Sequence, residues 1–139
     1  MGIADADSAE HDTDSKTFII HPVSCPAPNR REGGPKLSGA CHLRIDAGSR
    51  LADIYQGLEA EEEYFCNYEV NRDYLPDFVA AGLRLTAFDD NGELRAIELP
   101  GDRFFIATLF QPQLSSAENR PHPLIVAYLN ASAGSRVYS

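Results

Sequence analysis

Residues 83–110 read LRLTAFDDNGELRAIELPGDRFFIATLF, and this stretch decides the fold. Leu83–Phe88 and Glu93–Leu99 alternate in hydrophobicity, which is typical of strands with one buried face. Between them, Asp89-Asp90-Asn91-Gly92 predicts a hairpin turn, because Asn-Gly is the strongest short hairpin signal. Phe104–Phe110 is a continuous apolar run and predicts a central strand buried on both faces.

Caps, prolines and apolar spacing predict further elements on both sides of this stretch. They are strands at Thr17–Val23, Cys41–Ile45 and Tyr64–Val70, a helical turn at Ser49–Gly57, and helices at Arg72–Ala81 and His122–Ala133. Ser49 and Asn71 are the expected N-caps, and Gly57 and Gly82 the expected stops. Residues 24–40 predict a long loop rich in proline and glycine.

The order of these elements predicts an α/β layer fold with a β-hairpin and a C-terminal helix. A central strand buried on both faces needs helices on each side of the sheet, and only two clear helices are predicted. We therefore expect part of a larger layer structure to be missing, or to be supplied by a partner.

Composition excludes several classes of partner. The chain has 139 residues and a net charge of −9, so nucleic acid and anionic membrane surfaces are disfavoured. No apolar run approaches the roughly 20 residues of a membrane-spanning helix, and the N-terminus does not read as a secretory signal. Three widely spaced cysteines without a CxxC pair predict reduced thiols, a cytoplasmic location and no zinc site.

Several short motifs, taken in order, are similar to a known family. They are Asp7-Ser8-Ala9-Glu10, Lys36-Leu37-Ser38-Gly39, Tyr68-Glu69-Val70-Asn71, Ala81-Gly82-Leu83, Phe104-Phe105-Ile106-Ala107, Phe110-Gln111-Pro112-Gln113 and Pro121-His122-Pro123-Leu124. The chain resembles the glutaminase domain of CTP synthase, a class I glutamine amidotransferase. The resemblance covers nearly the whole chain. It implies part of the flavodoxin-like α/β fold of class I glutamine amidotransferases, in a single domain over residues 1–139.

The resemblance also indicates which catalytic groups the chain lacks. The family's nucleophilic cysteine sits in a Gly-x-Cys-x-Gly-x-Gln elbow, which by analogy would precede Met1. The family's catalytic His and Glu correspond to Gln111 and Gln113. An amide cannot take a proton near neutral pH, so neither residue can act as a general base or as a charged orienting group. We therefore expect a degenerate triad without glutaminase activity.

The substrate-binding positions are only partly kept. Glu10 matches a glutamate that contacts the substrate amino group in the family, and Tyr68 opens the matching Tyr-Glu-Val-Asn motif. The arginine that precedes this tyrosine in the family is Asn67 here, which removes a bidentate cation for the substrate carboxylate. Glu10, Asn67 and Tyr68 are thus the candidate binding residues, for a small amino-acid-like ligand.

The leading hypothesis is an incomplete amidotransferase-like domain that acts as a binding or regulatory module. One alternative is repurposed chemistry in the former glutamine pocket, with Glu10 as acid or base together with Cys66 or Tyr68. Another is a truncated product of a longer amidotransferase gene. We expect no metal or cofactor, and a second copy or a partner subunit over the open side of the sheet.

Three polar features are given structural interpretations. The acidic run Glu59–Glu63 predicts a solvated edge, and His122, at the start of the last helix, predicts a cap or a surface residue. Asp89 and Asp90 are assigned to turn chemistry rather than to a metal pair.

Overall fold

The computed structural model describes residues 2–11, 14, 16–22, 38–101 and 103–134. Most of the predicted loop at 24–40, together with Cys25, lies outside this described part. The strands are β1 Asp7–Ser8, β2 Phe18–Pro22, β3 Ser38–Ile45, β4 Glu59–Phe65, β5 Tyr68–Val70, β6 Arg84–Asp89, β7 Leu94–Glu98 and β8 Ile106–Thr108. The helices are α1 Arg50–Tyr55, a short 3-10 helix Arg72–Tyr74, α2 Leu75–Ala80 and α3 Pro123–Ser132.

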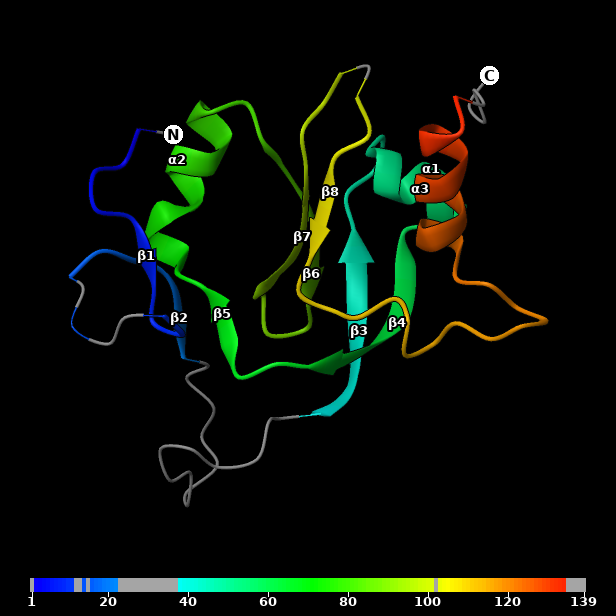
Figure 1. Ribbon diagram of the computed structural model, residues 1–139, viewed down its shortest axis with the longest axis horizontal. Coiled ribbons are helices and arrows are strands. Elements are labelled where there is room, and N and C mark those ends of the chain that lie inside the picture. Colours follow the sequence, from blue (N-terminus) through cyan, green and yellow to red (C-terminus); the bar gives the residue numbers. More distant parts are fainter. Residues whose placement is uncertain (1, 12–13, 15, 23–37, 102, 135–139) are drawn as a thin grey trace.

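The strands form two sheets, which Figure 1 shows side by side. The larger sheet has the order β4-β3-β6-β7-β8, and every neighbouring pair in it is antiparallel. The smaller sheet has the order β1-β2-β5, with β1 parallel and β5 antiparallel to β2. The chain passes from the larger sheet to the smaller one between β4 and β5.

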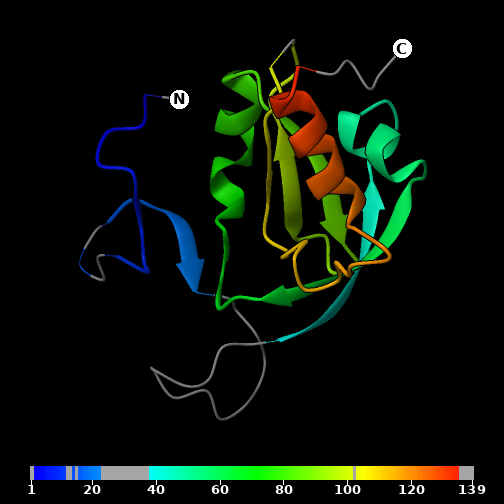
Figure 2. The same cartoon turned by 45° about the vertical axis from the view of Figure 1, so that its right-hand side comes forward.

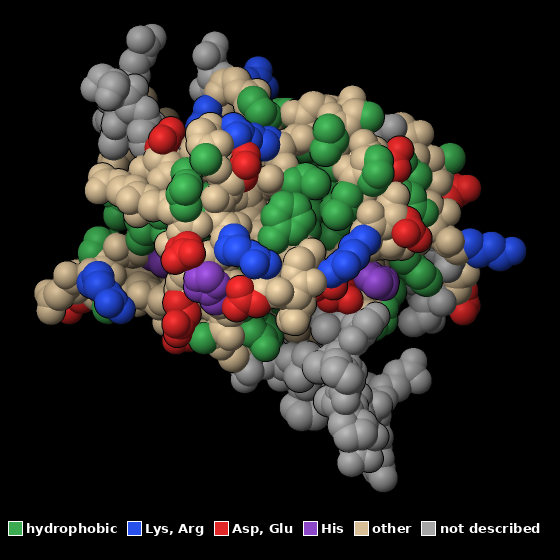
Figure 3. Space-filling model, turned by 180° about the vertical axis from the view of Figure 1, so that it is seen from behind, with side chains coloured by type: hydrophobic (Ala, Val, Ile, Leu, Met, Phe, Trp, Pro, Cys, Tyr) green, Lys and Arg blue, Asp and Glu red, His purple; other side chains and the backbone are tan. Residues whose placement is uncertain are grey.

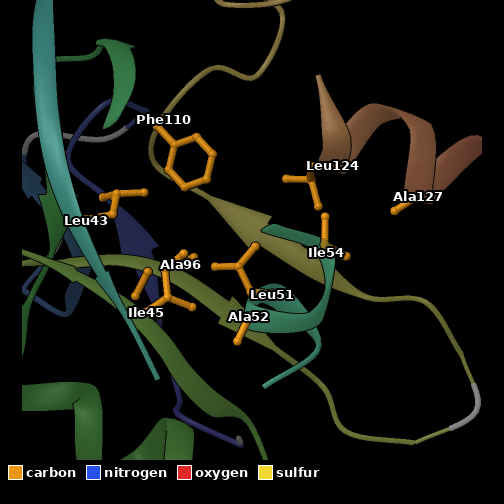
Figure 4. Close-up of a cluster of buried hydrophobic side chains, with 10 residues drawn as sticks. Leu43, Ile45, Leu51, Ala52, Ile54, Ala96, Phe110, Leu124 and Ala127 are labelled. Carbon is orange, nitrogen blue, oxygen red and sulfur yellow. The ribbon is translucent and has the colours of Figure 1, made fainter. Parts of the chain in front are cut away.

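Helices lie on both sides of the larger sheet, as Figure 2 shows: α1 and α3 together on one side, and α2 on the other. The main core lies under α1 and α3 and is drawn in Figure 4. It joins Leu43 of β3, Leu51 of α1 and Leu124 of α3 to Phe110, which follows β8. Phe110 is only 2% exposed, so the chain leaving β8 is fixed in the core. The predicted α/β class is confirmed.

The predicted hairpin between β6 and β7 is confirmed, and Asp89 organises its turn. Its Oδ1 accepts hydrogen bonds from the backbone N–H groups of Asn91 and Glu93, at 2.9 and 3.0 Å. Its Oδ2 accepts two from the guanidinium of Arg95, at 2.9 and 2.7 Å. Gly92 has a φ of +75°, a conformation that costs glycine little. Asp89 therefore serves the turn, as the sequence predicts.

The helix ends follow the predicted caps with one correction. Ser49 Oγ accepts from the N–H of Ala52 at 3.0 Å, and Asn71 Oδ1 accepts from that of Asp73 at 3.1 Å. Gly82, which follows the C-cap residue Ala81 of α2, has a φ of +86°. The stop of α1 is wrong by one residue, because Gln56, not Gly57, takes the left-handed conformation at φ +52°.

Two predicted strands are also corrected. Tyr64–Val70 is not one strand, because Cys66 and Asn67 link β4 to β5 in different sheets. Phe104–Phe110 is not a buried central strand. Its strand, β8, is the last of the five and pairs only with β7, which leaves Phe105 45% exposed. The run is apolar partly because Phe104, Ile106 and Phe110 pack on the core.

Candidate functional site

The structure brings Gln111 next to the Cys66–Tyr68 segment. The backbone N–H of Gln111 donates to the carbonyl of Glu63 at 3.0 Å, and the N–H of Phe65 donates to Gln111 Oε1 at 2.5 Å. Phe65 ends β4 directly before Cys66. Gln111 therefore lies at the end of β4 that leads into Cys66, Asn67 and Tyr68.

The other predicted site residues are more scattered. Gln113 is exposed. Cys66 is partly buried, and its Sγ accepts the N–H of Tyr68 at 3.4 Å. Glu10 is exposed just beyond β1, and in the smaller sheet β2 lies between β1 and the β5 strand that carries Tyr68. The described structure thus places Gln111 beside Phe65, which precedes Cys66. Glu10 instead follows β1, which lies at the edge of the smaller sheet away from β5.

A buried polar cluster, not predicted as a site, joins β4, α1 and the start of α3. We call Tyr55, Glu62, Ser115 and His122 the Glu62 cluster. Glu62 Oε1 lies 2.7 Å from His122 Nε2 and accepts the Tyr55 hydroxyl at 2.5 Å. Glu62 Oε2 accepts the Ser115 hydroxyl at 3.2 Å. Three donors therefore meet one buried carboxylate, which offsets the cost of removing it from water.

Both ring nitrogens of His122 are engaged. Nδ1 accepts the N–H of Leu124 at 3.2 Å and so caps α3, which confirms His122 as a cap. Because Nδ1 is an acceptor, the ring proton lies on Nε2 and is donated toward Glu62. The surface alternative for His122 is wrong, since its side chain is 4% exposed and that of Glu62 is 3% exposed.

This arrangement favours a structural role over catalysis. Ser115 donates to the carboxylate rather than to the imidazole, so the Ser, His and acid groups do not follow the order of a catalytic triad. The imidazole has no nitrogen left to take a proton from a substrate or nucleophile.

Tyr55 of this cluster and Cys41, which pairs with Glu62 across β3 and β4, have raised pKa values. Burial, followed by the hydrogen bond to Glu62, raises the pKa of the Tyr55 hydroxyl far above its usual value. Burial also raises the pKa of the Cys41 thiol, although Arg95 acts against it. Both groups therefore stay neutral at physiological pH, and neither is an activated nucleophile.

The burial of Glu62 corrects the prediction of a wholly solvated acidic run. Glu59, Glu61 and Glu63 are exposed, but Glu62 points with Ala60 and Tyr64 to the inner face of β4. The two-residue period of a strand offered a signal, since Glu62 lies between two less polar residues of the same face. Two of its partners, Ser115 and His122, lie 53 and 60 positions away in the sequence, so this run does not indicate them.

The described part of the chain holds no group of three or more His, Cys, Asp or Glu residues arranged to bind a metal ion. In the same residues, no helix has the length and apolar character needed to cross a membrane. Figure 3 shows the back of the molecule, where hydrophobic side chains gather centrally among acidic, basic and histidine side chains.

The comparisons with known sequences and with solved structures agree on one relationship. No protein-family model matches the chain. The structure is similar to that of the Trypanosoma brucei CTPS glutaminase domain with bound acivicin, with a TM-score of 0.86 and 30% identity. That similarity covers 99% of this chain and 54% of the trypanosomal chain.

The sequence is 35% identical to CTP synthase of Pyrobaculum aerophilum and 36% identical to that of Caldivirga maquilingensis, each over 137 residues. The chain is homologous to part of the CTP synthase glutaminase domain.

The relationship confirms the family resemblance and the fold class that it implied. The alignments cover 95% of this chain but only 25% and 24% of the two archaeal CTP synthases. The chain therefore spans about a quarter of the length of the curated relatives that it matches.

Proposed function

We propose that this chain is a CTP synthase-like glutaminase module that binds a ligand or a partner and does not hydrolyse glutamine. The observation that carries the proposal is the pair Gln111 and Gln113, at the positions where the family resemblance places the catalytic His and Glu. Neither amide takes a proton near neutral pH, so neither can activate a thiol or orient an imidazole.

The contacts of these residues support the proposal. The side-chain oxygen of Gln111 is held by the N–H of Phe65, and Gln113 is exposed. The Glu62 cluster contains a His and a carboxylate, but both are buried and fully hydrogen-bonded to each other and to their neighbours. It therefore offers no replacement for the missing general base.

For the ligand, we propose a small amino-acid-like molecule held near Tyr68. Asn67 replaces a cation with a neutral amide, so the affinity for a free carboxylate should be low. Titration of the labelled chain with L-glutamine, L-glutamate and acivicin, followed by amide NMR, tests this site. Shifts confined to residues 66–70 and the neighbourhood of Glu10 support it. Shifts elsewhere, or none at millimolar ligand, contradict it.

For the partner, we propose that a second copy or a partner subunit covers the open side of the larger sheet. The outer edge of β8 is unpaired in the described structure, and Leu99 and Phe105 beside it are exposed. An apolar strand edge of this kind is a template for pairing. Light scattering that gives a dimer supports the second copy, while a monomer that stays soluble at high concentration contradicts a need for cover.

The proposed lack of activity is tested by measuring glutamate released from L-glutamine by the purified chain. No release above that of a heat-denatured sample is expected. Release that is lost on Cys66→Ser or Glu10→Gln would instead establish repurposed chemistry at those residues.

A further inference from the structure

The segment after β8 links the two ends of the larger sheet. The N–H of Leu109 donates to the carbonyl of Arg95 in β7 at 2.9 Å, and the N–H of Gln111 donates to Glu63 in β4 at 3.0 Å. In the sheet order, β3 and β6 lie between these two strands. The larger sheet is thus curled enough for the three successive residues Leu109, Phe110 and Gln111 to reach from β7 to β4. Figure 1 draws this segment in yellow to orange.

Gln111 makes the hydrogen-bond pattern of a residue in a parallel β-pair. In such a pair, a residue donates its N–H to the residue before its partner and accepts an N–H from the residue after it. Around Tyr64, Gln111 donates to Glu63 and accepts from Phe65. The accepting atom is the side-chain Oε1, which takes the place of the backbone carbonyl oxygen.

We propose that Gln111 is a sheet-closing residue, whose side-chain amide completes a one-residue parallel bridge on the outer edge of β4. A glutamine amide has the same planar carbonyl as the peptide group and carries no charge, so it suits this place chemically. This role goes beyond the proposed function, because it holds whether or not the chain binds or hydrolyses glutamine.

The following residues anchor the same segment to the Glu62 cluster. Ser115 donates its hydroxyl to Glu62, and the N–H of His122 donates to Ser116 Oγ at 3.1 Å. Gln111 therefore lies at one end of a segment that is fixed at both ends. Its bridge also occupies the edge of β4 at Glu63 and Phe65, where an open strand could pair with another chain.

The bridge is tested first in the unaltered protein. A scalar coupling across the hydrogen bond between the Phe65 amide nitrogen and the Gln111 side-chain carbonyl carbon is the expected NMR signal. If the Phe65 and Gln111 resonances are assigned and sharp and no coupling is present, the bridge is contradicted. This readout needs no variant, so it stands even where a substitution prevents folding.

Matched variants then assign the bond to the amide oxygen. Gln111→Met keeps a similar length and removes the strong acceptor, Gln111→Glu keeps an acceptor oxygen, and Gln113→Met is the control at an exposed position. Hydrogen exchange at the Phe65 amide should become about tenfold faster in Gln111→Met. It should change little in Gln111→Glu and Gln113→Met. Equal exchange in all three variants overturns the proposal.

Discussion

His122 Nε2 lies 2.7 Å from Glu62 Oε1, and this contact joins β4 to the residue that caps α3. The two residues are 60 positions apart in the sequence, and both are almost completely buried. The same imidazole holds the first turn of α3 through Nδ1. The Glu62 cluster is therefore the polar link that fixes the C-terminal helix to the sheet.

Removing the imidazole should strongly destabilise the fold. His122→Ala leaves the Glu62 carboxylate buried with one donor fewer and removes the α3 cap, so we expect a loss of about 3 kcal/mol in the free energy of unfolding. Urea denaturation measures it. The control is His42→Ala, whose contact with Asp90 is exposed and should contribute less than about 0.5 kcal/mol. Equal losses in the two variants would contradict the structural role of His122.

Stability should depend on Tyr55 at high pH. Its folded pKa is raised above the usual value of 10.0, so the folded state keeps the hydroxyl neutral while the unfolded state ionises it. This contribution is complete below about pH 10 and is lost as the pH rises above that value. In Tyr55→Phe, the free energy of unfolding should therefore fall less steeply between about pH 9.5 and 11 than in the unaltered chain. Parallel curves would show that Tyr55 is not held neutral by the fold.

Thr86 and Thr108 carry hydroxyl groups that differ in hydrogen bonding. Within the described residues, Thr86 Oγ1 is buried and has no hydrogen-bond partner, whereas Thr108 Oγ1 donates to the carbonyl of Phe110 at 2.9 Å. Thr86→Val should stabilise the protein by up to about 1 kcal/mol, because a polar group leaves the core. Thr108→Val should destabilise it by about 1 kcal/mol. Thermal unfolding that ranks the variants the other way would contradict these assignments.

Cys41 should react slowly as a nucleophile. Burial raises its pKa, so little thiolate is present at pH 8, and access to the sulfur is restricted. Alkylation with iodoacetamide, located by mass spectrometry, should be about tenfold slower in the native chain than in urea. A native rate equal to the rate in urea would mean that Cys41 is freely accessible.

Local features of this fold are predictable from the sequence because their causes are local. The turn at Asn91-Gly92 and the caps at Ser49, Asn71 and His122 each depend on residues within a few positions of one another. Even there, the prediction that α1 stops at Gly57 is wrong, since Gln56 takes the left-handed conformation and such a residue need not be glycine.

The rest depends on contacts between distant segments. The burial of Glu62 is offset by donors that include Ser115 and His122, 53 and 60 positions away, and nothing in Glu59–Glu63 indicates those partners. The edge position of β8 follows from strand order, which the apolar run Phe104–Phe110 does not encode by itself. The bridge of Gln111 to β4 likewise depends on how the sheet curls.

The most direct test of the central claim is the rate at which the purified 139-residue chain releases glutamate from L-glutamine. A sensitive coupled assay would compare the unaltered chain with Cys66→Ser, Glu10→Gln and a heat-denatured sample. Because Gln111 and Gln113 provide no proton acceptor, the account predicts that all four samples give the same background rate. Release by the unaltered chain that disappears in Cys66→Ser would contradict it.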